Sequence, residues 1–125
     1  MPGAAARPDP KATLGGQITV APMLRSQLRP DDVVFVVVRR DDGTDHGGVV
    51  LGVKRYGADR WPIAFHLDNR DAMTARTALS GRVVVSARVD HDGDATTREP
   101  GDLIGAVRGE VGQEGLALLV DAVAK

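Results

Sequence analysis

From residue 17 onward, the chain alternates between short apolar runs and polar turn segments. The runs are four to nine residues long and rich in Val, Leu and Ile, which is typical of β-strands. Gly and Asp, which favour turns, concentrate between them. The pattern predicts strands at residues 17–20, 33–38, 49–55, 61–67, 83–89, 103–111 and 116–120. About seven short strands at this spacing predict an all-β fold, an antiparallel β-sandwich.

The apolar runs differ in the burial that they predict. Residues 33–38 are six consecutive β-branched or aromatic residues, so we expect a central strand buried on both faces. Residues 83–89 form a second strongly apolar strand that should share its core. Residues 17–20 alternate polar and apolar side chains and stop before Pro22, which predicts a short, half-buried strand at a sheet edge.

The C-terminal segments are less regular. Residues 103–111 are interrupted by Gly105 and Gly109, which predicts a weak, poorly defended edge strand. In residues 116–120 the apolar side chains alternate, which favours a closing strand, although the same segment also fits one face of a helix. Earlier in the chain, residues 23–28 could make one helical turn.

Composition sets the domain organisation. The 125 residues fit one domain, and residues 1–14, rich in Pro and Ala, are expected to form a flexible tail ahead of a domain at 15–125. A net charge of −1, with 16 basic and 17 acidic residues spread along the chain, argues against a nucleic-acid interface. No apolar stretch reaches the roughly 18 residues of a membrane span, and the N-terminus lacks the apolar core of a signal peptide.

The residues that could carry chemistry are few. The chain has no cysteine, which excludes a disulfide framework, a thiolate metal site and covalent haem attachment. His46 and His91 lie in turns among aspartates, where solvated histidines are common, and His66 should point away from the apolar face of its strand. For a metal site, two of these histidines would have to converge with Met23, Met73 or a carboxylate. We therefore expect no metal and no cofactor.

Two acidic segments could suggest a metal site or a catalytic carboxylate pair. Asp90, Asp92 and Asp94 could begin a calcium loop, but Ala95 and Gly101 stand where the pattern requires glycine and glutamate, so a hairpin turn is the better interpretation.

Asp68 and Asp71 could form a carboxylate pair, but they are more simply explained as caps of the turn at 69–73. No serine lies in a Gly-x-Ser-x-Gly elbow, and we expect no enzymatic activity.

Several blocks, in unbroken order over about residues 15–121, resemble the C-terminal periplasmic domain of CycH/CcmI-type cytochrome c biogenesis proteins. The blocks lie at residues 16–24, 30–39, 49–55, 62–68, 71–73, 79–89 and 100–105, with Gly93 between the last two. The resemblance implies an immunoglobulin-like sandwich and a periplasmic location. It does not include the membrane anchor or the helical repeats of that family, which predicts an excised domain or a small stand-alone relative.

The resemblance also implies a function as a non-catalytic accessory domain of cytochrome c maturation. Its partner would be an apocytochrome or a haem-ligation component, bound at a sheet edge or face. The candidate partner surface comprises Ile18, Val107 and Trp61, the first two on the expected edge strands, which could also mediate self-association. Trp61 is more simply explained as a residue that fills the core or caps an edge, because a sandwich needs large apolar side chains and this chain has few. The alternatives are a small-ligand or metal-binding module around His46 and His91, and a structural spacer.

Overall fold

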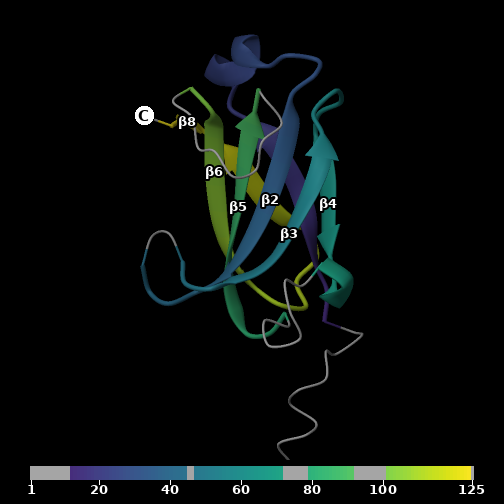
Figure 1. The fold of residues 1–125 in the computed structure, drawn as a ribbon, viewed down its shortest axis with the longest axis vertical. Coiled ribbons are helices and arrows are strands. Elements are labelled where there is room, and N and C mark those ends of the chain that lie inside the picture. The colour runs from purple at the N-terminus through teal and green to yellow at the C-terminus, as the bar shows by residue number, and fades with distance from the viewer. Residues whose placement is uncertain (1–11, 45–46, 72–78, 92–100, 125) are drawn as a thin grey trace, which may run out of the picture.

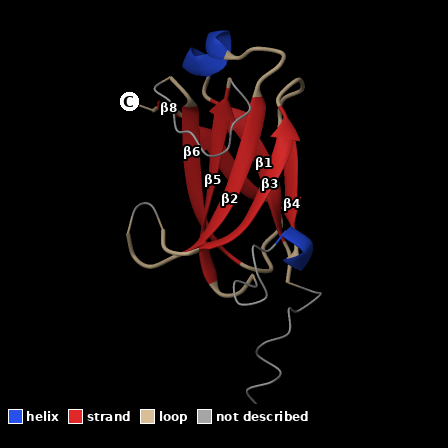
Figure 2. Cartoon of the chain, viewed as in Figure 1, coloured by secondary structure: helices blue, strands red, loops and turns tan. Residues whose placement is uncertain are grey.

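A computed structural model of the chain describes residues 12–44, 47–71, 79–91 and 101–124. These residues form two packed β-sheets, drawn in Figure 1 with the larger sheet in front. The strands are β1 (Leu14–Val20), β2 (Val33–Arg40), β3 (Val50–Gly57), β4 (Ile63–Leu67), β5 (Arg82–Asp90), β6 (Leu103–Glu110), β7 (Leu116–Val120) and β8 (Ala122–Val123). Two short 3₁₀ helices, η1 (Pro22–Gln27) and η2 (Asn69–Asp71), lie at opposite ends of the sandwich (Figure 2). The predicted all-β sandwich is confirmed.

The larger sheet has the strand order β3-β2-β5-β6-β8, and every neighbouring pair in it is antiparallel. Its centre is the β2–β5 pair, which joins the two most apolar segments of the chain. Val34, Val36 and Val38 of β2 point into the space between the sheets and are fully buried there. Val33 and Phe35 are also buried but lie outside that core cluster. The prediction that residues 33–38 form a central strand buried on both faces is therefore confirmed.

The smaller sheet has the order β4-β1-β7. β1 pairs antiparallel with β4 on one side and parallel with β7 on the other. The prediction that residues 17–20 form an edge strand is wrong, because β7 returns along β1 and covers its second edge. Alternation along a strand reports which face is buried, and it carries no information about the number of neighbours.

The first strand also begins earlier than predicted. Leu14 starts β1 and is fully buried, and Ala12 is 7% exposed. The domain therefore begins before residue 15. Ala12 and Leu14 belong to the core, although the Pro-rich composition of residues 1–14 predicted a tail. Residues 1–11 lie outside the described part of the chain.

The C-terminal strands close one side of the sandwich. Residues 116–120 form a strand, as predicted, and the chain then crosses at Asp121 to the larger sheet, where β8 pairs with Leu103 and Ile104 of β6. Gly105 lies where β7 crosses, and a β-carbon built on it would lie only 2.1 Å from the carbonyl oxygen of Leu119. The glycine that weakened the strand pattern at 103–111 is thus required for the close approach of two backbones.

Within the described residues no helix is long and apolar enough to cross a membrane.

We predict that Gly105→Ala destabilises the protein by about 1–3 kcal/mol, because the added methyl group must displace β7 backbone atoms and not a flexible side chain. Ala106→Ser is the matched control on the same strand, since Ala106 is exposed and should tolerate the change within about 0.5 kcal/mol. Urea unfolding followed by circular dichroism measures both. Equal stability of the two variants would show that β7 does not pack against Gly105.

Candidate functional site

Buried charged groups gather at one end of the larger sheet. Asp32, just before β2, and Asp90, the last residue of β5, are 2% and 1% exposed, and Asp102, just before β6, is 3% exposed. The strand pairing brings them together, since Val33 lies opposite Asp90 and Val89 opposite Leu103. Carboxylates this deeply buried require paired charges or hydrogen-bond donors.

Asp32 is held by a histidine and by the backbone. Its Oδ1 lies 2.5 Å from Nδ1 of His91, and its Oδ2 accepts a 2.7 Å hydrogen bond from the backbone N–H of Arg29. The expectation that His91 is a solvated loop histidine is therefore wrong. The sequence showed only turn residues at both places, and the two are brought together by the β2–β5 pairing across 59 positions.

Arg88 forms ion pairs with the other two carboxylates, Asp90 and Asp102. Its Nη2 lies 3.3 Å from Oδ2 of Asp90, and its Nε lies 3.7 Å from Oδ2 of Asp102. The guanidinium also lies over the ring of Phe35, 5.5 Å from the ring centroid, in a cation–π arrangement. Asp32, His91, Arg88, Asp90 and Asp102 thus form a structural network that joins the ends of β2, β5 and β6.

The two candidate carboxylates at η2 cap a turn, as predicted. Oδ2 of Asp71 accepts the backbone N–H of Asp68 at 3.0 Å, and Oδ1 of Asp68 accepts the backbone N–H of Arg70 at 2.8 Å. The Arg70 guanidinium also donates to Asp68, and this bond is the main reason that the pKa of Asp68 falls to about 2. Asp68 therefore stays ionised at neutral pH and is bound on two sides, which does not suit proton transfer.

His66 points outward from β4, as predicted, with its Nδ1 3.6 Å from Oε1 of Glu114. The backbone N–H and C=O groups of His66 bind two side chains of β3. The hydroxyl of Tyr56 accepts the His66 N–H at 2.9 Å, and Nζ of Lys54 donates to its carbonyl oxygen at 2.7 Å. Two β3 side chains therefore occupy backbone groups on the outer edge of β4. No pattern in the sequence predicts this contact.

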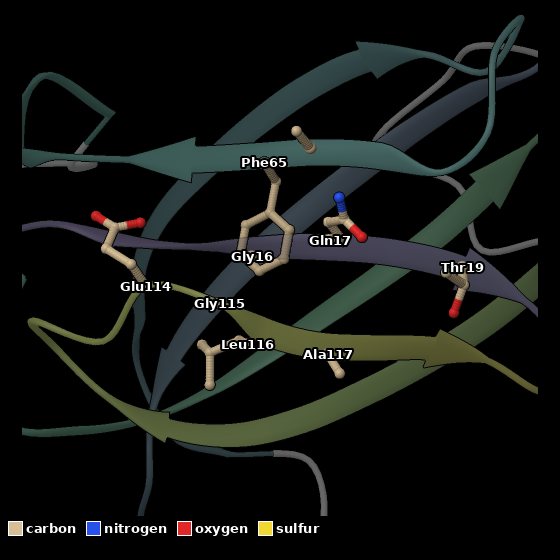
Figure 3. A pocket seen from close by; sticks show the side chains of 9 residues that line it. Gly16, Gln17, Thr19, Phe65, Glu114, Gly115, Leu116 and Ala117 are labelled. Atoms are coloured by element: carbon tan, nitrogen blue, oxygen red, sulfur yellow. The ribbon is translucent and has the colours of Figure 1, made fainter.

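A shallow groove of about 510 Å³ lies on the outer face of the smaller sheet (Figure 3). Gln17, Thr19, Ala64 and Ala117 line it with small or neutral side chains, and Glu114 lies at one end. The Glu114 carboxylate accepts a 3.0 Å hydrogen bond from the Thr13 hydroxyl and would collide with any β-carbon on Gly15. This groove is open and almost uncharged, so it suits the surface of a macromolecule better than an enclosed small molecule.

The three residues proposed as a partner surface, Ile18, Val107 and Trp61, all lie in or against the core. Ile18 is fully buried in the central strand β1, and Val107 points inward from β6 and packs against the core. Trp61 is partly buried against the same core, and its Nε1 is buried with no hydrogen-bond partner among the described residues. The side chain of Ile18 thus cannot reach a partner, and a lysine at Ile18 or Val107 would disrupt the core before it tested any edge.

The metal hypothesis concerns residues that are only partly described. His46, Met73, Asp92 and Asp94 lie outside the described residues. Within residues 12–44, 47–71, 79–91 and 101–124, no group of three or more His, Cys, Asp or Glu side chains has the arrangement of a metal site.

We predict that His91→Ala lowers the free energy of unfolding by at least about 2 kcal/mol, because it leaves the Asp32 carboxylate buried without its side-chain partner. His66→Ala is the matched control, since His66 and Glu114 are both half exposed and should contribute less than about 0.5 kcal/mol. Chemical denaturation at pH 7 measures the difference. Similar values for both histidines would contradict the network described for Asp32.

We also predict that Arg70→Ala raises the pKa of Asp68 from about 2 toward 3.8, incompletely because the backbone N–H of residue 70 still donates. The folded-state pKa of Asp68 is below its unfolded value, so its stabilising contribution is present above about pH 4 and is lost as the pH falls toward 2. Carboxyl ¹³C NMR titration measures the shift. Asp42, whose pKa is lowered by the Thr44 hydroxyl, should titrate unchanged.

Comparison with known proteins assigns the fold to a family. Residues 14–121 match the family described as the cytochrome c-type biogenesis protein H Ig-like domain. The match covers both sheets and ends at Asp121, where the chain crosses to β8. Neither the curated proteins nor the solved structures contain a match to the chain.

Proposed function

Because the chain belongs to the cytochrome c-type biogenesis protein H Ig-like domain family, we propose that it is a non-catalytic interaction domain of cytochrome c maturation. In this role it binds a protein partner in the periplasm, either an apocytochrome or a component of haem ligation. The observation that carries the proposal is the family match over residues 14–121, which spans almost all of the described structure.

The use of the polar side chains supports an interaction role. Among the described residues, the carboxylates and histidines that could have suggested chemistry make structural contacts. Asp32 pairs with His91, Arg88 links Asp90 and Asp102, and Asp68 caps η2. When such groups stabilise the fold itself, a β-sandwich can still bind a protein partner through its sheet faces and sheet edges.

We predict that the 125-residue chain binds haem-free cytochrome c or a haem-ligation component with a dissociation constant of about 1–100 μM, the range of small transient interfaces. Isothermal titration calorimetry with each purified partner measures the binding. Folded holocytochrome is the control for the apocytochrome, since a maturation partner should prefer the haem-free chain. Absence of binding to both partners at about 100 μM would contradict the proposal.

A further inference from the structure

A sheet edge presents unpaired backbone N–H and C=O groups, and among the described residues the edge of β4 and both ends of β6 have partners for such groups. On β4, Pro62 precedes the strand without an N–H group, and the side chains of Tyr56 and Lys54 occupy the N–H and C=O groups of His66. On β6, β8 pairs with Ile104, and the Gln113 side chain accepts the N–H of Glu110. Between these two positions, β7 packs over the face of β6 at Gly105, where a β-carbon would meet the Leu119 carbonyl oxygen.

β3 has a different edge. It is the terminal strand of the larger sheet, eight residues long, and is drawn in Figure 1 as the outermost strand of the front sheet on the β4 side. The bond from the N–H of Ala58 to the carbonyl of Asp32 fixes the alternation of its pairing with β2. In that alternation the hydrogen bonds to β2 come from Gly52, Lys54 and Tyr56.

The backbone groups of Val53, Arg55 and Gly57 consequently point away from β2. They have no hydrogen-bond partner among the described residues. β4 does not supply one, because the side chain of Tyr56 lies between the two strands and contacts the His66 backbone. β3 and β4 belong to different sheets, so β4 does not take the position of a paired strand at roughly 4.8 Å from β3 in the plane of the larger sheet.

The charge of β3 selects the kind of strand that fits. β3 carries Lys54 and Arg55 and no carboxylate. Arg55 is exposed and has no ion-pair partner among the described residues, whereas Lys54 lies 3.8 Å from Asp71. A second copy of this chain would bring two such cationic strands together, and like charges on paired strands are destabilising.

We infer that the β3 edge binds an extended, acidic segment of a partner protein by β-strand addition. The segment hydrogen-bonds to the backbone of Val53, Arg55 and Gly57, and its carboxylates lie beside Arg55. Near Gly57 the segment carries no acidic residue, because the Asp59 carboxylate is already there, 3.4 Å from the β-carbon position of Gly57. The assignment of this partner to cytochrome c maturation rests on the proposed function. The mode of binding at the β3 edge is argued independently of it.

The test uses the ¹⁵N-labelled 125-residue chain and two capped heptapeptides. One is acetyl-Thr-Val-Glu-Val-Glu-Val-Thr-amide, and the other has lysine in place of both glutamates. We expect the acidic peptide to shift the amide resonances of Val53, Arg55 and Gly57 and the lysine peptide to leave them unchanged. No shift up to millimolar peptide, shifts centred on another strand, or equal binding of both peptides would each overturn the inference.

Two substitutions distinguish the contribution of backbone hydrogen bonds to peptide binding from that of charge. Val53→Pro removes an N–H that faces the open edge and leaves the bonds to β2 in place, and Arg55→Glu reverses the charge. Each should weaken the acidic peptide at least tenfold. The control Arg40→Glu, at an exposed residue of β2 without an ion pair among the described residues, should change the affinity less than twofold. If Val53→Pro does not fold, the affinity of the acidic peptide for Arg55→Glu tests the inference. Unchanged affinity in a folded variant overturns it.

The same variants distinguish this inference from the proposed function. If an apocytochrome or haem-ligation component binds wild type and both β3 variants equally, the proposed function holds and the β3 edge is not its interface. If the acidic peptide binds β3 but neither cytochrome component binds the chain, the edge is a binding site and the proposed function is wrong.

Discussion

The close packing of the β7 backbone against Gly105 determines how the sandwich closes. Because no side chain separates the strands at this position, β7 can lie on the smaller sheet beside β1 while the next residues join β6 in the larger sheet. One segment of the chain thereby covers an edge of each sheet. The strand β1, which the pattern predicted at an edge, becomes central for this reason, and β3 is the terminal strand at the other side of the larger sheet.

The second constraint is the neutralisation of charge at the ends of the central strands. Asp32, Asp90 and Asp102 are nearly inaccessible to water, and burial of a carboxylate is costly unless a partner offsets the loss of hydration. His91 and Arg88 provide that compensation, and Arg88 also covers the ring of Phe35. These groups fix the relative positions of the ends of β2, β5 and β6. The same residues therefore stabilise the fold through their ion pairs.

Beyond these two constraints, two surface features distinguish the described part of the protein. The open groove of the smaller sheet is almost uncharged, and the β3 edge is cationic, with backbone groups that have no hydrogen-bond partner in the described part of the chain. The two features favour different contacts, since a groove binds a partner surface of complementary shape and a sheet edge binds an extended chain. An assembly factor can use either kind of contact, and the chain belongs to a family of cytochrome c-type biogenesis domains.

The sequence by itself determined the all-β class, the positions of seven strands, the buried valines of β2 and β5, and the cap at η2. These features follow from period-two patterns and from turn residues that act within a few positions. The order of strands, the parallel return of β7, the pairing of Asp32 with His91 and the open edge at β3 were decided only by the tertiary structure. Each depends on which strands become neighbours across tens of residues, and the alternation of side chains along one strand does not encode its neighbours.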